Sequence, residues 1–527
     1  MNEKLMKIIN REEILDKKFL FIGLDGGSKK IVDELLRQKK LPVIEKLINN
    51  GSYFTSHSDG LGASPVLWTS ISTGKKQEKH GINSFYGTSE NVTAKRIWEI
   101  FDELGFPVGV FGHFISWPPK KLNGFLIPDL LALDNRCYPE KYGFMWDITN
   151  NEKNKKSASP GKLLGYFVNS YKNGVKLSTL IKAAAEYIKR KIVVSDKLDS
   201  YYSLRIIKTL FHKDLFVKLY RQYIPKYSFL HIHLVDGCSH RFWKHMQPEH
   251  YKNVSPNKIA QHGSKIYDAY CCADRTIGEI VNCADSDTVI ILASDHGFKA
   301  PEKDMHWANN VTLNVNKFEE IFDEHIRKDL NFSLILPFIH LSIRNVTPEK
   351  NEYCKKIIKS AIVVEDGKHL FNIHEVDHGN LVLSFNNKDI REISGKRIDI
   401  NGRVLSAIDI FVLDHDFSSG VHDIEDGMLV LCGPDIKRNY HQKESVQVTD
   451  IMPTILALCN MPVGNDMDGN VIEGVFDEQF MKKYPVRFVD SYESNSSEDA
   501  GVKSLKKELS DEETESLKDQ LKNLGYL

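Results

Sequence analysis

Six residues with metal-binding side chains follow short apolar runs or tight turns of the sequence. Three aspartates come directly after apolar runs, two of them have a histidine close behind, and a further histidine follows a glycine. Mixed carboxylate and imidazole ligands suit zinc, manganese or iron better than calcium. The sequence therefore predicts one site for metal ions, formed by Asp25, Asp236, His240, Asp295, His296 and His422.

The apolar runs at residues 20–24, 229–235 and 288–294 predict buried strands that carry the aspartates at their C-terminal ends. Open α/β sheets bind their ligands at this edge, and a helix over residues 29–38 would follow the first strand. A long helix over residues 257–281 would pack on the sheet before the third strand. Each residue taken alone has a simpler explanation, since an aspartate at a strand end caps a helix and a buried histidine is usually hydrogen-bonded. Asp236 and His240 are four residues apart and would share one face if the turn after the strand is helical. The spacing of the whole set does not specify the reaction.

A second candidate group is the hydroxyl of Ser64, which precedes Pro65 at the start of a helix predicted over residues 64–73. Serine is favoured at the helix cap and proline at the first helical position. A serine in this place also lies beside free backbone N–H groups that bind anions. From this segment alone, a cap is the favoured explanation of Ser64.

Composition narrows the class of protein. The 527 residues carry a net charge of −1, which gives no reason to expect a nucleic acid partner. The charged N-terminus has no secretory h-region, and no apolar run is long enough to span a bilayer. The eight cysteines include no C-x-x-C pair, and we predict that they are free thiols. We therefore expect a cytoplasmic protein with no membrane span.

The length predicts a main domain with insertions. A basic stretch rich in helical apolar spacing predicts a helical lobe, whose charge is either a solvated face or a means of steering an anionic substrate. A C-terminal helix has Leu517, Leu521 and Leu524 on one face, which must dock on the body or join two copies in a homo-oligomer. The predicted segments are a catalytic core at 18–149, 227–300 and 402–490, a helical insertion lobe at 150–226, a cap at 301–401, and an acidic linker with the C-terminal helix at 491–527.

An ordered set of short motifs spans nearly the whole chain. They are Ile22 to Gly26, Leu41-Pro42, Ser64 to Ser70 with Thr73-Gly74, His80-Gly81-Ile82, Trp117-Pro118-Pro119, Asp236 with His240 and Trp243, Ser294 to Phe298, Gly420-Val421-His422, Gly433-Pro434, Asp450 to Ala457, Asp468-Gly469 and Leu524 to Leu527. With this set the sequence resembles the alkaline phosphatase superfamily, specifically the type I phosphodiesterase/nucleotide pyrophosphatase family and its predicted phosphohydrolase or phosphomutase branch.

The resemblance implies an alkaline-phosphatase-like α/β fold with a mostly parallel sheet flanked by helices. It also implies a metal-dependent phosphoric-ester hydrolase with two divalent metal ions, zinc first and manganese or iron as alternatives. Ser64 would be the nucleophile that forms a phosphoseryl intermediate, with Thr69 as the alternative if the register differs. One metal would be held by Asp25, Asp295, His296 and Ser64, and the other by Asp236, His240 and His422.

Two departures from the family pattern bear on the substrate. Nucleotide pyrophosphatases carry an asparagine five residues after the His80 position, where this chain has Phe85, and Asn83 is the stand-in. The arginine of the sulfatase signature is absent. A small phosphorylated or phosphodiester substrate is expected, with diesters favoured by family likeness. The alternatives are a phosphomutase or phosphotransferase on the same site, and a non-catalytic binding protein that kept the fold.

Several further polar residues are interpreted as structural. We interpret Lys75, Lys76 and His80 as turn and surface residues. His113, His231, His233 and His306 read as structural histidines.

Overall fold

The computed structural model describes most of the chain. The described residues are 13–59, 63–153, 160–192, 196–251, 254–301, 311–335, 338–376, 380–386, 395–413, 419–441, 444–493 and 509–524. His306 lies outside them.

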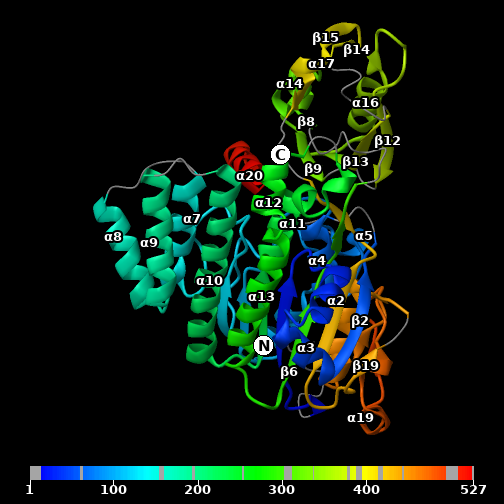
Figure 1. Ribbon diagram of the computed structural model, residues 1–527. Helices are drawn as coiled ribbons and strands as arrows, with labels where there is room; N and C mark the ends of the chain where they lie inside the picture. The colour runs from blue at the N-terminus through cyan, green and yellow to red at the C-terminus, as the bar shows by residue number, and fades with distance from the viewer. Residues whose placement is uncertain are drawn as a thin grey trace.

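A nine-stranded, mostly parallel sheet forms the centre of the main domain, as predicted (Figure 1). The strand order is β19-β2-β18-β6-β1-β5-β3-β4, with β20 also paired to β2, and only β18 runs antiparallel to its neighbours. The strands are β1 (Lys18–Leu24), β2 (Gly51–His57), β3 (Val108–Phe111), β4 (Gly124–Ile127), β5 (Tyr227–Ile232), β6 (Thr288–Ala293), β18 (Gly427–Cys432), β19 (Tyr440–His441) and β20 (Val446–Gln447).

Helices cover both faces of the sheet. Successive side chains of β1, which point to opposite faces, are therefore buried alike. Leu20 and Ile22 point to the face covered by α2 (Lys29–Arg37), α3 (Pro42–Asn49), α10 (Lys197–Tyr223), α11 (Leu234–Met246) and α13 (Lys265–Val281). Phe19 and Phe21 point to the other face, covered by α4 (Ser64–Thr73), α6 (Ile97–Glu103) and α18 (Ile451–Leu458). The smaller core elements are α5 (Gln77–His80), η2 (Glu140–Tyr142), η3 (Pro248–His250), α12 (Pro256–His262), η6 (Val448–Asp450), β21 (Val463–Gly464), η7 (Glu473–Val475), α19 (Glu478–Lys483) and β22 (Phe488–Val489).

Two predicted element boundaries are wrong. The strand expected over 229–235 ends at Ile232, because α11 begins at Leu234 and takes Asp236 into its first turn. The single helix expected over 257–281 is two helices, α12 and α13, separated at Gly263 and Ser264. Both helices pack against α11, and α13 also packs against α10 and α3.

The helices α7 (Phe144–Lys153), α8 (Pro160–Lys172) and α9 (Leu177–Ile192) stand side by side at the left of Figure 1. Of these, α8 and α9 lie within the predicted lobe of residues 150–226, whereas α7 begins before its predicted start. The fourth helix of the predicted stretch, α10, lies against β3, β4 and β5. Its Leu215, Phe216 and Leu219 are buried in the main core. The helix α10 is therefore a layer of the α/β core, and the part that projects is shorter than predicted.

The cap projects from one end of the core and has an apolar core of its own (Figure 1). Its elements continue past the predicted end at residue 401, because β16 returns to pair with β8 near the start of the cap. They are β8 (Val311–Leu313), α14 (Val315–Glu319), α15 (Glu324–Arg327), β9 (Leu330–Ile335), β10 (Phe338–Ile343), α16 (Pro348–Lys359), β11 (Ile362–Val363), β12 (Phe371–Val376), β13 (Asn380–Phe385), β14 (Arg397–Ile400), β15 (Arg403–Ser406), α17 (Ala407–Ile410) and β16 (Phe411–Leu413).

The C-terminal helix α20 (Asp511–Leu524) begins with the predicted capping box. The Ser510 N–H donates to Glu513 Oε2 at 2.8 Å, and the Glu513 N–H donates to Ser510 Oγ at 3.1 Å. Leu517 and Leu521 are buried in the core of their own chain. The apolar face on which the predicted homo-oligomer depended is thus covered within one molecule.

All eight cysteines are free thiols. Among the helices of the described residues, none is long and apolar enough to cross a lipid bilayer.

Candidate metal centre

Asp25 stands at the C-terminal end of β1, where its N–H donates to the Ile232 carbonyl of β5 at 3.0 Å. The next residue, Gly26, has φ +68°, and a Cβ there would lie 2.6 Å from the Phe298 ring and 3.0 Å from Asp236 Cα. Glycine is required because the backbone after Asp25 both turns and touches the start of α11. This close approach brings the loops that carry Asp25 and Asp236 together.

Asp236 and His240 lie one turn apart on α11 and share a face, as the four-residue spacing predicted. The His240 Nε2 atom is 3.4 Å from Asp236 Oδ1. His422 arrives from β17 (Val421–Asp423), which pairs with β7 (Gly297–Lys299), and its Nε2 is 3.0 Å from His240 Nε2. The same nitrogen is 3.7 Å from Asp236 Oδ1. These three side chains converge from two elements that are far apart in the sequence.

Asp295 and His296 follow β6, and they meet Ser64 at the first residue of α4. The Ser64 Oγ atom is 3.3 Å from His296 Nε2, which is itself 3.4 Å from Asp295 Oδ2. The His296 Nδ1–H donates to the Gly297 carbonyl at 2.9 Å, so Nε2 carries the lone pair that faces Ser64. Asp295 Oδ1 accepts from the Gly26 N–H at 3.2 Å, whereas its buried Oδ2 accepts no hydrogen bond from the described residues.

Ring geometry divides the histidines between two subsites. The rings of His296 and His422 are stacked 3.6 Å apart at 20°. A ring nitrogen binds a cation in the plane of its ring, so two nearly parallel stacked rings cannot both direct lone pairs at one ion. The His240 and His422 rings are inclined at 47° with their Nε2 atoms adjacent, which suits a shared ion. The arrangement favours one subsite at His240 and His422 and another at His296.

Burial and mutual repulsion perturb the acids of the centre. Burial raises the pKa of Asp295 well above its ordinary value, and the negative charge of Asp25 raises it further. Burial also acts to raise the pKa of Asp236, but the neighbouring His240 and then His422 outweigh it, so that this pKa lies below its ordinary value. Burial lowers the pKa of His296. Carboxylates held this close in the interior require compensating positive charge.

The donor atoms fit divalent cations. Asp25, Asp295 and His296 form one group whose ligand atoms lie within 4.8 Å of one another. Asp236, His296 and His422 also have ligand atoms within this distance, but the stacking of the two rings prevents both histidines from binding one ion. Carboxylate oxygens and imidazole nitrogens are ligands of zinc and of neighbouring transition metals. The buried Asp295 Oδ2, which accepts no hydrogen bond from the described residues, is an atom that a cation would satisfy.

A third group joins Asp25 to His231 and His233, two histidines that the sequence analysis interpreted as structural. Their rings are stacked 4.3 Å apart at 8°, so their in-plane lone pairs do not converge. His233 instead approaches Asp25, with 3.0 Å between His233 Nδ1 and Asp25 Oδ2. The other oxygen of Asp25 accepts from the Trp68 indole N–H at 3.1 Å. Trp68 and His233 therefore hold the two oxygens of one carboxylate.

Sequence reasoning did not assign these positioning roles. Trp68 appeared only as one member of a motif, four residues after Ser64. Its place on the inner face of α4 was the available signal, since residues four apart lie on one side of a helix. For His233, the signal was alternation with His231 along the strand that leads to Asp236.

The remaining predicted site residues lie in different surroundings. The alternative nucleophile Thr69 is buried, and its hydroxyl donates to the Pro65 carbonyl of its own helix at 2.7 Å. Asn83 is half-buried in the loop after α5, and among the described residues no hydrogen bond joins it to the acids and imidazoles of the centre. Phe85 is buried nearby. The geometry thus brings Ser64, and neither of the other two, to the metal-binding side chains.

The expected row of free N–H groups after Ser64 is absent from the described backbone. Ala63 is the cap residue of α4, so Ser64 is already inside the helix. Pro65 has no N–H, and the N–H groups of Val66 and Leu67 both donate to the Ala63 carbonyl. Any backbone contribution to binding an oxyanion is limited to the N–H of Ser64 itself.

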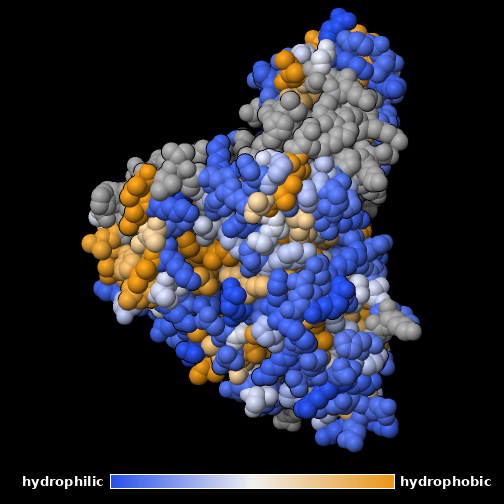
Figure 2. All heavy atoms as spheres, in the orientation of Figure 1, coloured by the Kyte–Doolittle hydropathy of each residue, from blue (hydrophilic) through white to orange (hydrophobic). Residues whose placement is uncertain are grey.

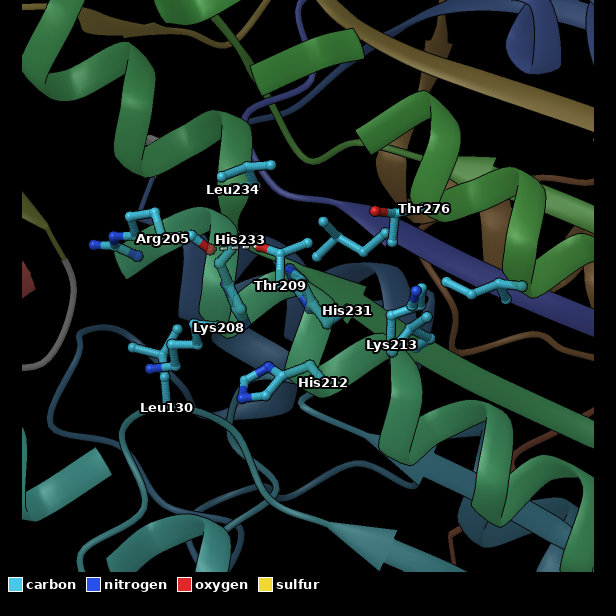
Figure 3. Close-up of a pocket in the computed structure, with 13 residues that line it drawn as sticks. Leu130, Arg205, Lys208, Thr209, His212, Lys213, His231, His233, Leu234 and Thr276 are labelled. Carbon is cyan, nitrogen blue, oxygen red and sulfur yellow. Dashed lines mark hydrogen bonds between the residues drawn. The ribbon is translucent and has the colours of Figure 1, made fainter. Parts of the chain in front are cut away.

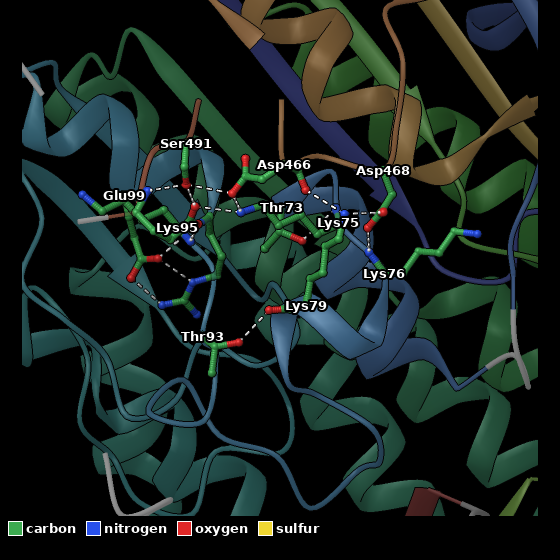
Figure 4. Close-up of polar contacts among 12 residues, drawn as sticks. Thr73, Lys75, Lys76, Lys79, Thr93, Lys95, Glu99, Asp466, Asp468 and Ser491 are labelled. Carbon is green, nitrogen blue, oxygen red and sulfur yellow. Dashed lines mark hydrogen bonds and ion pairs between the residues drawn. The ribbon is translucent and has the colours of Figure 1, made fainter. Parts of the chain in front are cut away.

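A polar network fixes the turn that follows α4 (Figure 4). The Lys75 ammonium group lies 2.6 Å from Asp466 Oδ2 and 2.7 Å from Glu493 Oε2, and Lys79 pairs with Asp468 at 2.6 Å. Lys75 is buried, so its interpretation as a surface residue is wrong. The network ties the end of α4 to the C-terminal part of the core.

His80 is buried as well, contrary to its interpretation as a surface residue. Its Nδ1 accepts from the Ile82 N–H at 3.2 Å, and its Nε2 lies 3.1 Å from Ser70 Oγ. Burial lowers the pKa of His80 to about 3. The neutral ring therefore connects the turn after α5 to α4.

A small cavity of about 30 Å³ lies between α10 and the end of β5 (Figure 3). Arg205, Lys208 and His212 of α10 line it, together with His231 and His233. Its volume corresponds to about one water molecule, so it is too small for a phosphoric ester. The cavity therefore offers no substrate pocket.

Comparisons with known proteins agree with the motif pattern. The family model described as type I phosphodiesterase/nucleotide pyrophosphatase matches residues 19–384. Murine ectonucleotide pyrophosphatase/phosphodiesterase 5 is 13% identical with a TM-score of 0.45, covering 88% of this chain and 100% of that chain. An inactive variant of the murine protein in complex with AMP gives 12% identity with the same TM-score and coverage. The human protein gives 11% identity and a TM-score of 0.45, covering 89% of this chain and 99% of that chain. A search of curated protein sequences finds no match.

Proposed function

The chain belongs to the type I phosphodiesterase/nucleotide pyrophosphatase family, and we propose that it is a metal-dependent phosphoric-ester hydrolase with Ser64 as its nucleophile. The observation that carries this proposal is the contact of Ser64 with His296, beside the Asp25, Asp295 and His296 group and the convergence of Asp236, His240 and His422. Asp25, Asp295, His296 and Ser64 would hold one divalent cation. Asp236, His240 and His422 would hold a second.

The residues of the chain divide the chemistry between them. Bound divalent cations supply Lewis-acid stabilisation of oxyanions and favour the ionised form of the serine hydroxyl. Ser64 Oγ attacks the phosphorus atom, the P–O bond to the departing alcohol breaks, and a phosphoseryl ester forms. Water then cleaves the Ser64–phosphate bond, which regenerates the hydroxyl and releases phosphate or a phosphomonoester. Throughout, Trp68 and His233 hold the Asp25 carboxylate in one orientation.

Diesters are the proposed preferred substrates, and zinc is the first candidate metal. Family membership supports the diester, and the mixed oxygen and nitrogen donors support zinc, manganese or iron.

The test compares hydrolysis of paired p-nitrophenyl phosphate monoesters and diesters. The protein is stripped of metal, its metal content is measured, and zinc, manganese or iron is resupplied. Ser64→Ala is expected to lower metal-restored turnover by at least about 1,000-fold, the order expected when a nucleophile is removed. Thr69→Val is the matched control on the same helix and should retain most activity.

Three results would count against the proposal. If Ser64→Ala kept full activity, Ser64 would not be the nucleophile. If only Thr69→Val lost activity, Thr69 would be the nucleophile instead. Transfer of phosphate to an added alcohol in place of water would indicate a phosphotransferase. A protein that binds no divalent metal would be a non-catalytic member of the family.

A further inference from the structure

The helices α8 and α9 expose a stripe of large apolar side chains. On α8 these residues recur three or four positions apart and on α9 four or seven positions apart, so on each helix they lie along one side. Their exposed fractions run from 41% to 77%, and Figure 2 shows them as a hydrophobic band at the left of the molecule. The stripe contains Leu164, Val168 and Tyr171 of α8 and Leu177, Ile181, Ile188 and Ile192 of α9.

The buried sides of the same hairpin already attach it to the core. Leu180 and Val175 are buried, and the Thr179 hydroxyl donates to Asp214 Oδ2 of α10 at 2.6 Å. Lys176 pairs with Glu279 of α13 at 2.7 Å. The exposed stripe is therefore not needed to hold α8 and α9 in place. A contiguous apolar surface of this kind on a folded protein marks an interaction site.

The charge around the stripe is strongly positive. Residues 160–192 contain six lysines and one arginine against a single acid, Glu186, a net charge of +6. Lys182 and Lys189 are exposed and follow one border of the stripe on α9, about a third of a turn from Ile181 and Ile188. Long lysine side chains at such a border can lay their alkyl stems on an apolar phase and keep their ammonium groups in water.

We propose that the α8–α9 hairpin docks on the surface of an anionic lipid bilayer. Aliphatic side chains on one side and lysines at its border are the features of helices that lie in a membrane interface. A second copy of the chain would bring two hairpins together, each with a net charge of +6 over residues 160–192, and they would repel each other. A nucleic acid would satisfy the lysines but leave the aliphatic stripe in water. This proposal goes beyond the hydrolase function and does not depend on it.

The test uses the full-length protein in co-sedimentation with vesicles of phosphatidylcholine alone or of phosphatidylcholine and phosphatidylglycerol in equal parts. We expect binding to the anionic vesicles that weakens as salt is added. Each basic residue near such a surface contributes about fivefold in partitioning (about 1 kcal/mol), so K172Q/K182Q/K189Q should lower it about 100-fold. The apolar variant I181Q/I188Q should lower it by at least about tenfold.

Matched controls separate docking from general surface effects. V404Q/I408Q removes two comparably exposed apolar side chains, at 55% and 66%, from the cap. K39Q/K120Q removes two exposed lysines from the core. Both controls should bind vesicles like the unaltered protein. All variants should hydrolyse a soluble p-nitrophenyl ester at the unaltered rate if that activity is present, and circular dichroism checks the fold independently of it.

The proposal is overturned if the protein does not bind anionic vesicles. Equal binding to both vesicle types would also overturn it, because the lysines would then have no role. If sedimentation velocity instead shows a dimer that I181Q/I188Q dissociates, the stripe is an interface between copies.

Discussion

Replacing Trp68 with phenylalanine should weaken metal binding and turnover about 10- to 100-fold while the fold persists. The indole N–H donates to Asp25 Oδ1 at 3.1 Å, and Trp68 is 0% exposed. A hydrogen bond to a charged group contributes about 1.5–3 kcal/mol, and about 1.4 kcal/mol corresponds to a factor of ten. Phenylalanine keeps most of the packing against Phe21 but leaves one oxygen of Asp25 without its donor.

Competition with a chelating dye gives the metal dissociation constant, and p-nitrophenyl diester hydrolysis gives kcat/KM. Trp98→Phe is the matched control, because Trp98 is equally buried in the same apolar cluster and does not contact Asp25. Both variants should lose similar thermal stability, and only Trp68→Phe should lose metal affinity. Equal affinities in the two variants would refute the positioning role of Trp68.

Three further changes should act on stability. His80→Asn should flatten the pH dependence of unfolding, because a neutral His80 with pKa of about 3 contributes stability that is complete above the unfolded value of 6.5 and falls by about 2 kcal/mol on acidification to about pH 5. Lys75→Met should lower the free energy of unfolding by about 2–3 kcal/mol in urea titrations, because it strands Asp466 and Glu493, which are partly exposed at 33% and 28%. Leu521→Ala should cost about 2–5 kcal/mol and leave the sedimentation coefficient unchanged.

One of these predictions has a matched control variant, and each has a result that would contradict it. Lys79→Met removes a pair in which the lysine is 46% exposed, so it should change stability by less than about 1 kcal/mol. Equal effects of the two lysine variants would contradict the special place of Lys75. An unchanged pH slope in His80→Asn would show that other buried histidines account for the acid loss. A shift of Leu521→Ala from dimer to monomer would restore the predicted homo-oligomer.

Local patterns predicted the parts of the centre that depend on single elements. The strands before Asp25 and Asp295 were predicted correctly, because buried parallel strands are continuous apolar runs in the sequence. The shared face of Asp236 and His240 was also predicted correctly, although the strand before them ends earlier than expected. The two side chains share a face because α11 begins at Leu234, before Asp236, so that both residues lie in the helix one turn apart.

Long-range packing decided what the sequence could not predict. The contact of His233 with Asp25 depends on two strands being neighbours in the sheet, and no local pattern encodes that order. The break at Gly263 separates two helices that both pack against α11, a helix close to them in sequence and in space, so their apolar pattern continues across it. The end of the cap depends on the pairing of β16 with β8, since short strands resemble one another in composition whichever sheet they join.

The pairing of β7 with β17 has a consequence for the ancestry of the fold. Lys299 lies opposite Val421, so the two chain ends that lead into and out of the cap leave the core at adjacent strands, about 5 Å apart. In topology, the cap is therefore an insertion in the loop of a β-hairpin formed by β7 and β17, and its length does not affect the core. Descendants of a common scaffold could therefore gain, lose or exchange this module while His296 and His422, at the base of the hairpin, keep their separation.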